Sequence, residues 1–534
     1  MNKLRFSSVS QRHLGRAIQM QAEQNGDTPF IMFDQLRFTY RETNDRVNEL
    51  AAGLAREGVG RGDRVAFFMD ACPEVIFLVL AVNKLGAVWV PINTDYKGFW
   101  LADTIQRSRP GLLVIDENHA PKVMALGDEL GDIELVVLGS DELVPESTAF
   151  DSLYITGAPE PDLSDFDYGD TCAILWTSGT TGKSKGVMQS HNVWFNACED
   201  TNERNGTSAG DVIYNVLPTY NSAAWVTGIF RALIAGVPLA MDPHFSVSHF
   251  WERVRFYRAT EVFTLGSMHI LLWNAPERPD DADHTLTKIT PVPMPAEIAE
   301  PFEERFGVKI MGQGMAQSEA MRVISQYNDR KPWPPGSCGT ATRFVDIRLV
   351  KDNGEDAAVG EHGECWVKPR YPFVLFNGYF DDPEATRNAF EGEWYKTGDV
   401  LRKDAEDNYY FVDRKKDSVR YKGRNISTFE VELAARKHPA VADCAAFGIP
   451  SEELDSEHEL KLNCVLHPGQ TLSEEELASY INDTAPYFFV PRYIEFVDSL
   501  PYTPTNKVQK YKLREIGLTP ETWDARRAGF RAAR

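Results

Sequence analysis

The chain has 534 residues and a net charge of −22, with 43% hydrophobic and 25% charged residues. At roughly 150 residues per compact unit, this length predicts about three to four units with large buried cores. The negative charge would repel a phosphate backbone or an anionic lipid surface, so it argues against nucleic-acid binding and membrane binding.

The seven cysteines are scattered along the chain, and none of them forms a Cys-x-x-Cys pair. This pattern is typical of reduced thiols in a cytosol. The longest strongly apolar run, residues 75–82, is too short to span a bilayer, and the N-terminal residues lack the apolar core of a signal peptide. We therefore expect a cytoplasmic protein.

Short β-branched or aromatic segments alternate with helical segments from residue 64 onward. The predicted strands lie at 64–69, 88–92, 112–116 and 135–138 and, after a Pro/Asp-rich stretch at 159–170, at 212–217, 237–242, 261–266, 288–292 and 309–314. Such alternation predicts mostly parallel sheets covered by helices, with ligand-binding loops at the carboxyl ends of the strands.

The elements become shorter beyond about residue 410. Strands are predicted at 408–412, 418–422, 441–447, 461–466 and 492–497, and two helices should begin at the capping boxes Ser427/Glu430 and Ser473/Glu476. The sequence thus predicts an α/β fold with a large N-terminal domain at 1–412 and a small α+β domain at 417–534. The charged segment 413–416 should join the two domains.

The segment TCAILWTSGTTGKSKGV, residues 171–187, places an apolar strand before two glycine-bounded turns. Its hydroxyl, amide and ammonium groups suit a polyphosphate, although a flexible Ser/Thr/Gly surface loop has the same composition. A Walker motif does not fit, because Thr177 stands where that motif needs glycine, five positions before Gly182.

Residues 177–186 resemble the phosphate loop of the adenylate-forming superfamily, which includes acyl-CoA synthetases, luciferases and peptide-synthetase adenylation domains. Ser184 replaces the usual proline. Further family signatures follow in the family's order over nearly the whole chain: MAQSE at 315–319, YKTGD at 395–399, FVDRKKD at 411–417 and LPYTPTNKVQKYKLRE at 500–515. At two positions, Asn221 and the segment TPVPMP at 290–295, the sequence resembles the branch containing carnitine-type CoA ligases more than the long-chain or acetyl branches.

The resemblance implies a set of nucleotide-binding residues. Those matching the family's ATP and AMP ligands are Thr177, Ser178, Gly179, Thr180, Thr181, Gly182, Lys183, Lys185, Asp399 and Arg414. Glu319 matches the magnesium ligand, and its carboxylate oxygens suit that hard cation. Ser318 matches a residue near the α-phosphate, and Met315 replaces the aromatic residue usual beside the adenine.

The C-terminal signatures imply a mobile small domain. Lys507 matches the lysine that contacts the carboxylate and the α-phosphate during adenylation, although Asn506 stands where glycine is usual. Lys416 matches the hinge, and Lys422 with Gly423 matches the face presented to CoA. The catalytic residues implied by the family are therefore Lys507, Glu319, Ser318 and Thr177.

The implied activity is ATP-dependent, AMP-forming activation of a small or medium carboxylic acid with Mg²⁺, followed by transfer of the acyl group to CoA. The predicted acyl pocket is mixed aromatic and polar and contains Tyr220, Asn221, Trp225, Val226 and Gly266.

Several questions stay open at this point. One alternative passes the adenylate to a carrier-protein thiol or to oxidation, and another is a catalytically silent nucleotide-binding homologue. His244 and His249, five positions apart, do not have the spacing of a metal pair on a helix. A homodimer is the default expectation for the oligomeric state.

Overall fold

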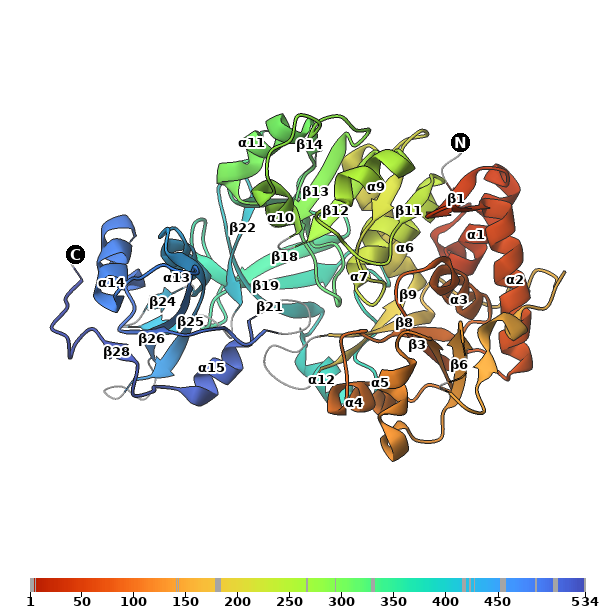
Figure 1. Cartoon of the computed structure of the whole chain (residues 1–534), viewed down its shortest axis with the longest axis horizontal. Helices are drawn as coiled ribbons and strands as arrows, with labels where there is room; N and C mark the ends of the chain where they lie inside the picture. Colours follow the sequence, from red (N-terminus) through yellow and green to blue (C-terminus); the bar gives the residue numbers. More distant parts are fainter. Residues whose placement is uncertain are drawn as a thin grey trace. The chain divides into compact units, whose positions relative to one another are not determined.

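The structure is a computed structural model that describes residues 4 and 6–532, apart from 141, 143, 178–183, 266–267, 293, 328–331, 415–418, 422–423, 427, 452–457, 486 and 503–507. The chain divides into two compact units (Figure 1). The large unit is built from Met1–Thr177, Lys185–Asp346 and Lys368–Glu393. The small unit contains Ile347–Val367 and Trp394–Arg534. The hinge expected at 413–416 stays a prediction.

Two seven-stranded sheets form the framework of the large unit. The first has the order β14-β13-β12-β10-β11-β1-β2, with bounds β14 Lys309–Ile310, β13 Lys288–Val292, β12 Glu261–Leu265, β10 Ile213–Asn215, β11 Leu239–Met241, β1 Pro29–Phe33 and β2 Leu36–Thr39. The second has the order β7-β6-β5-β3-β4-β8-β9, with bounds β7 Thr148–Ala149, β6 Glu134–Leu138, β5 Leu112–Asp116, β3 Arg64–Phe68, β4 Val88–Pro91, β8 Thr171–Trp176 and β9 Gly186–Ser190. Their neighbouring strands are parallel except for β1/β2 and β8/β9.

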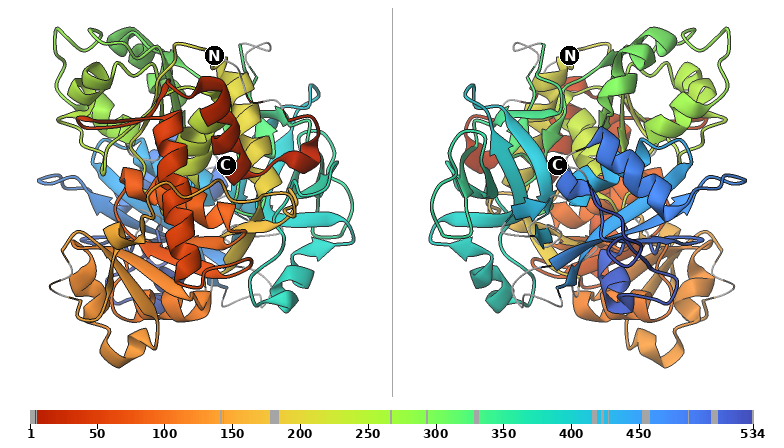
Figure 2. Two further views of the ribbon diagram at one scale, coloured as in Figure 1. Left: turned by 90° about the vertical axis from the view of Figure 1, so that its right-hand side faces the viewer. Right: turned by 90° about the vertical axis from the view of Figure 1, so that its left-hand side faces the viewer.

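Helices cover both faces of each sheet. The central layer, which packs against both sheets, contains α1 Leu14–Asn25, α2 Tyr40–Arg56, α3 Pro73–Lys84, α6 His191–Asn205 and α8 Phe230–Ala235. The outer face of the first sheet carries α9 Phe250–Tyr257, α10 Met268–Asn274 and α11 Ala296–Phe306, and that of the second carries α4 Phe99–Ser108 and α5 Ala120–Met124. Figure 2 shows α1 and α2 running side by side at the edge of the central layer.

The alternation of side chains along a strand explains this layering. Val65 and Phe67 of β3 join the central core, whereas Ala66 and Phe68 join the core under α4 and α5. Helix α3 is buried along its whole length from Val75. A helix that is apolar all round must lie inside a protein, and the two sheets enclose this one.

The carboxyl-terminal part of the large unit adds shorter elements. They are β15 Gly314–Met315, β16 Ile324–Ser325, β17 Ser337–Ala341, α12 Pro383–Asn388 and β20 Phe390–Glu391. Strands β15, β16 and β17 pair in an antiparallel meander. Asp382 caps α12 by accepting a hydrogen bond from the amide of Ala385 at 2.9 Å.

The small unit contains antiparallel strands and a four-stranded sheet with helices on both faces. The strands are β18 Val345–Val350 and β19 His362–Pro369, each mostly in this unit, and β21 Trp394–Lys403, β22 Tyr409–Arg414, β23 Val419–Tyr421 and β24 Arg424–Ile426. The pairs β19/β21, β21/β22 and β23/β24 are antiparallel. The four-stranded sheet has the order β25 Val441–Pro450, β26 His458–Leu466, β27 Tyr493–Phe496 and β28 Trp523–Asp524. Helices α13 Thr428–Arg436 and α14 Glu474–Thr484 cover one face, and α15 Lys510–Ile516 covers the other.

The predicted α/β fold, with a large N-terminal part of mostly parallel sheets and a small α+β C-terminal part, is confirmed. The capping box at Ser473 and Glu476 is also present. Ser427, the other predicted helix start, lies outside the described residues. The antiparallel strands between β15 and β22 were not predicted as a sheet.

Candidate active site

The phosphate-loop segment leaves the second sheet at the end of β8 and returns to it at β9. Trp176 and Gly186 are opposite each other in the antiparallel β8/β9 pair. Just beyond them, the amide of Thr177 donates to the carbonyl of Lys185 at 3.0 Å, and the amide of Lys185 donates to Thr177 Oγ1 at 3.3 Å. These bonds close the base of the loop, so Thr177 and Lys185 are held together.

The predicted phosphate ligands between these two residues lie outside the described residues: Ser178, Gly179, Thr180, Thr181, Gly182 and Lys183. Four other predicted functional positions do as well, namely Lys416, Lys422, Gly423 and Lys507, and so does Gly266 of the acyl pocket. Their assigned roles stay predictions.

A strand-like segment at 377–380 lies along β9. The amide of Phe380 donates to the carbonyl of Gly186 at 2.7 Å, and Met188 exchanges backbone bonds with Asn377 and Gly378 at 2.8 and 3.0 Å. Gly186 has no room for a side chain, because an added Cβ would lie 2.9 Å from a methyl group of Ile174. This segment therefore occupies a fixed position beside the end of the phosphate loop.

Glu319 lies on the loop that follows β15 and is held through both its backbone and its side chain. Its carbonyl accepts the amide of Phe376 at 2.9 Å, and its Oε1 accepts the hydroxyl of Tyr379 at 2.8 Å. The carbonyl of Ser318, the neighbouring predicted residue, accepts a hydrogen bond from Gln189 of β9. Both predicted residues are thereby tied to the strands next to the phosphate loop.

Tyr379 connects the loop to the glutamate. The ammonium of Lys185 lies 4.5 Å from the centroid of its ring, while its hydroxyl donates to Glu319. Sequence reasoning missed this tyrosine. A glycine before it and an Asp-Pro helix start after it were visible signals, but neither indicates a contact with a residue 60 positions away.

A buried ion pair supports the loop that follows β15 and contains Glu319. Arg322 donates to Asp200 of α6 at 2.7 Å, and Asp200 also accepts the hydroxyl of Tyr327 at 2.5 Å. Burial would raise the pKa of Asp200, but Arg322 and Tyr327 together keep this pKa below its ordinary value. The carboxylate therefore stays charged and anchors the segment after Glu319 to the central helices.

Asp399 belongs to the small unit. It is 2% exposed on β21, and its amide donates to Thr397 Oγ1 at 3.1 Å. Arg414, with which it is expected to bind ribose, is its direct partner in the antiparallel β21/β22 register. The register thus pairs two residues that are 15 positions apart in the sequence.

The predicted acyl-pocket residues lie around an irregular helix between β10 and β11. Asn221 caps the short α7 Ser222–Ala224, which continues into a five-residue π-helix, η4, at Trp225–Ile229. Insertions of this kind occur frequently at functional sites. Tyr220 is half-buried, and its hydroxyl donates to Asp95 at 3.3 Å.

Trp225 itself points into the core. It is fully buried, and its ring centroid lies 4.8 Å from those of Trp89 and Phe230. Its indole N–H donates to the carbonyl of Thr219 at 2.7 Å. Val226 is partly exposed on the next position of the π-helix. Of these two residues, Trp225 is thus part of the packed core, and Val226 is the more accessible.

A second group of potential metal-ligating side chains lies at the carboxyl ends of β3 and β5. Ligand atoms of Asp70, Asp116 and His119 lie within 4.8 Å of one another, and His244 approaches Asp70 at 3.4 Å. Asp116 accepts the amides of Asp70 at 2.8 Å and His119 at 2.9 Å. These hydrogen bonds stabilise the turns that follow β3 and β5, and this structural role explains the cluster.

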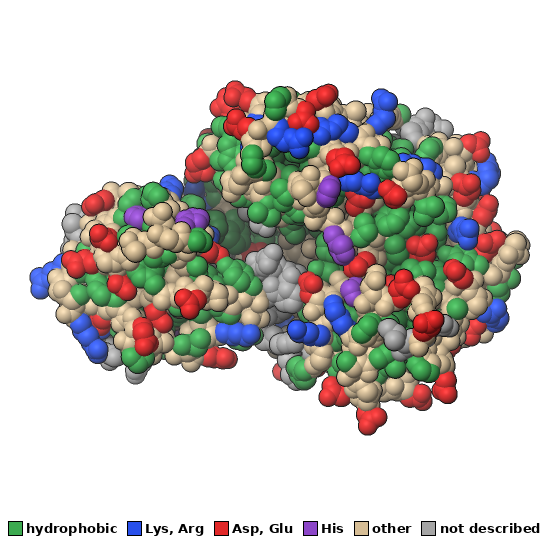
Figure 3. All heavy atoms as spheres, in the orientation of Figure 1, with side chains coloured by type: hydrophobic (Ala, Val, Ile, Leu, Met, Phe, Trp, Pro, Cys, Tyr) green, Lys and Arg blue, Asp and Glu red, His purple; other side chains and the backbone are tan. Residues whose placement is uncertain are grey.

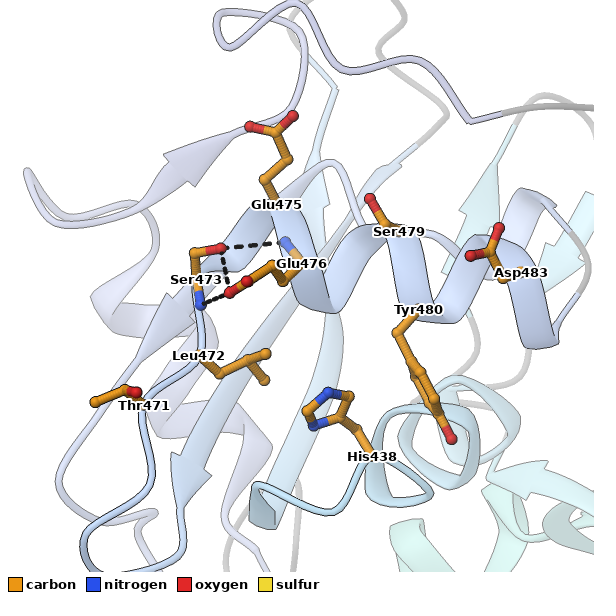
Figure 4. Close-up of a pocket in the computed structure, with 9 residues that line it drawn as sticks. All are labelled: His438, Thr471, Leu472, Ser473, Glu475, Glu476, Ser479, Tyr480 and Asp483. Carbon is orange, nitrogen blue, oxygen red and sulfur yellow. Dashed lines mark hydrogen bonds between the residues drawn. The ribbon is translucent and has the colours of Figure 1, made fainter.

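The small unit carries an open hollow of about 670 Å³ along α14, lined from Thr471 to Asp483. Figure 4 shows His438 beside Tyr480, whose rings meet edge to face, and Ser473 and Glu476 joined in the capping box. The rim of the hollow is acidic, and the hollow contains none of the predicted catalytic residues. On the face shown in Figure 3, acidic and basic side chains are interspersed over each unit.

The chain matches two family patterns. The pattern of AMP-binding enzymes matches residues 18–380, and that of the AMP-binding enzyme C-terminal domain matches residues 430–507. The chain belongs to the AMP-binding enzyme family. This membership confirms the resemblance to adenylate-forming enzymes.

Relatives of similar length support the acyl-CoA branch of this family. Crotonobetaine/carnitine–CoA ligases of Salmonella paratyphi B and Salmonella typhi are each 30% identical over 513 residues, covering 92% of this chain and 96% of the relative. The ATP-bound structure of MatB from Rhodopseudomonas palustris is 25% identical with a TM-score of 0.82, covering 94% of this chain and 98% of that one. A benzoate CoA ligase from Burkholderia xenovorans has the same fold, with 22% identity, a TM-score of 0.82 and coverage of 94% and 99%.

This AMP-binding enzyme is an AMP-forming acid–CoA ligase that works through an acyl adenylate. Its substrates are ATP, a carboxylic acid and CoA. Among the described helices, none combines the length and the apolar character that a membrane crossing requires.

Proposed function

We propose that this enzyme activates a small or medium acid of polar character. The relatives at 30% identity are named for crotonobetaine and carnitine, which are short, polar acids. The observation that carries the proposal is the hydrogen bond that half-buried Tyr220 donates to Asp95, next to Asn221 in the sequence. Polar side chains such as Tyr220, Asp95 and Asn221 suit a short polar acid better than a long alkyl chain.

The two half-reactions explain why the site needs both phosphate ligands and a mobile cation. A carboxylate oxygen attacks the α-phosphorus of ATP, and pyrophosphate leaves; the CoA sulfur then attacks the acyl carbon, and AMP leaves. The first step concentrates negative charge around phosphorus, so catalysis depends on placement and on cations. We assign this work to Thr177, Lys185 and the loop between them, and to Lys507.

We assign Glu319 to magnesium and Ser318 to the α-phosphate region. The fit of Glu319 rests on its half-buried carboxylate, whose Oε1 accepts a hydrogen bond from Tyr379. No hydrogen bond reaches its Oε2 from any residue that the structure describes. Carboxylate oxygen is the donor that Mg²⁺ prefers, and the bound ion would neutralise phosphate charge.

Asp399 and Arg414 are assigned to the ribose, because a buried carboxylate can accept two hydrogen bonds from vicinal hydroxyls. Lys416 is assigned to the hinge within 413–416, and Lys422 with Gly423 to CoA. A motion about this hinge would exchange Lys507 for the CoA-binding face between half-reactions.

The remaining proposals concern the surroundings of the enzyme. None of the seven cysteines, all of which the structure describes, forms a disulfide, and five of them are buried, which supports a reducing, cytoplasmic compartment. We propose a homodimer as the oligomeric state, because dimers are the commonest oligomers among soluble proteins.

A carboxylate panel tests the proposed substrate class. Release of AMP and pyrophosphate would be measured with crotonobetaine and carnitine, with neutral acids from butyrate to dodecanoate, and with benzoate. We expect the highest kcat/KM among the short polar acids. A preference that rises steadily with chain length towards dodecanoate would refute the proposal.

A further inference from the structure

Tyr379 stands between two groups of opposite charge at the proposed nucleotide site. Its side chain is buried, with 6% of the residue exposed. The hydroxyl donates to Glu319 Oε1 at 2.8 Å, and the ammonium of Lys185 lies 4.5 Å from the ring centroid. A cation at this distance from an aromatic ring is attracted to its face. The ring of Tyr379 thus contacts the ammonium of Lys185, while its hydroxyl binds the carboxylate of Glu319.

The backbone leaves this side chain little freedom. Tyr379 forms a bridge with Val187 of β9, and its amide donates to Thr386 Oγ1 of α12 at 2.9 Å. Its ring also packs against that of Phe376, with centroids 4.9 Å apart. The position of the hydroxyl is therefore set by a sheet strand and a helix, both of which are rigid elements.

The arrangement keeps the two charges apart. No ion pair joins Lys185 to Glu319, although both side chains contact the same tyrosine and both are described. A direct ion pair would neutralise the ammonium that a phosphate needs and the carboxylate that a cation needs. The tyrosine gives each of them another partner, one on the ring face and one at the hydroxyl.

We propose that Tyr379 is a positioning residue for the activation of ATP. Its hydroxyl holds Oε1 of Glu319 so that Oε2 faces the metal, and its ring holds the ammonium of Lys185 towards the phosphates. The proposal rests on the proposed assignment of Glu319 to magnesium. Groups that orient metal ligands in this way typically contribute a factor of about 10–100 to metal affinity or activity.

Calorimetric titration of ATP without the acid measures this effect with no turnover. For each variant, the ATP affinity would be determined with saturating Mg²⁺ and again with EDTA, and the ratio of the two gives the enhancement by the metal. Tyr379→Phe keeps the ring and removes the hydroxyl, so the enhancement should fall by about 10–100-fold. Tyr379→Leu also removes the ring, so ATP should bind more weakly in EDTA as well.

A double-mutant cycle tests whether the tyrosine acts through the glutamate. In a Glu319→Gln background, Tyr379→Phe should have little further effect on the enhancement, because the carboxylate that it positions is gone. An enhancement that Tyr379→Phe leaves at the wild-type value, or effects of the two substitutions that simply add, would overturn the proposal.

Tyr40→Phe is the matched control. This buried tyrosine of α2 loses a hydroxyl that lies 3.0 Å from the carbonyl of Val237, and the enhancement should stay at the wild-type value. The single variant Glu319→Gln distinguishes a failure of the magnesium assignment from a failure of the positioning role. If it leaves the enhancement intact, the magnesium assignment fails. If it abolishes the enhancement and Tyr379→Phe does not reduce it, only the positioning role fails.

Discussion

Mild acid should destabilise the large unit through His191, the first residue of α6. Its ring is buried, its Nδ1 accepts the amide of Leu14 at 3.3 Å, and its centroid lies 3.9 Å from that of His13. Burial, followed by the charge of Arg16, lowers the pKa of His191 from 6.5 to about 3. The imidazole therefore stays neutral in the folded protein at pH values where the unfolded chain binds a proton.

Proton linkage gives the sign and the size of the effect. Between pH 6.5 and about 3 the unfolded state carries one more proton at His191 than the folded state, so the free energy of unfolding decreases as the pH falls. The slope is about 1.4 kcal/mol per pH unit, or about 2 kcal/mol from pH 6.5 to 5. Burial, and next the proximity of His191, also lower the pKa of His13, which adds to the loss.

Urea unfolding between pH 7.5 and 5, followed by tryptophan fluorescence, measures this slope. His191→Asn offers an amide oxygen in place of Nδ1 but removes the titrating ring, so its unfolding free energy should depend less steeply on pH than that of the wild type. The control is His249→Asn, which removes an imidazole that is 66% exposed and should keep the wild-type slope. Equal slopes in the wild type and His191→Asn would refute the reasoning.

Three further substitutions test the site and the core. Lys507→Ala should slow adenylate formation by on the order of 100-fold or more, while thioester formation from a supplied acyl adenylate continues; equal loss of both steps contradicts the assignment. Asp399→Asn should raise the KM for ATP by about 10–100-fold, because a charge-assisted hydrogen bond to ribose is worth about 1.5–3 kcal/mol, and an unchanged KM removes Asp399 from the ribose site. Trp225→Ala should lower the free energy of unfolding by about 3–5 kcal/mol in urea titrations, because it opens a cavity beside Trp89 and Phe230. A loss under 1 kcal/mol would mean that the aromatic cluster repacks.

Features that depend on residues close together in the sequence could be predicted well. The strand at Arg64–Phe68, the helix that Pro73 begins and the capping box at Ser473 each depend on residues within a few positions of one another. The same holds for the phosphate-loop motif at 177–186, which is read as one uninterrupted string. Local propensity and hydrogen-bonding chemistry decide such features, so they can be recognised without knowledge of the rest of the chain.

Other features could not be predicted because they depend on distant pairs. The antiparallel register that places Asp399 opposite Arg414 depends on which strands meet. The burial of His191, which shifts its pKa, arises only when α1 packs against the start of α6. The division of the chain into interleaved units likewise requires residues 368–393 to join a sheet formed much earlier in the chain.

The order of residues along the chain was sufficient to establish the layered α/β plan, the family and the chemistry of adenylate formation, since each is encoded in short runs whose spacing has a direct physical meaning. Folding in three dimensions decided which side chains support that chemistry. Tyr379 reaches Glu319 and Lys185 only because residues 377–380 pair with β9, and no local pattern encodes a contact between segments 60 or more positions apart.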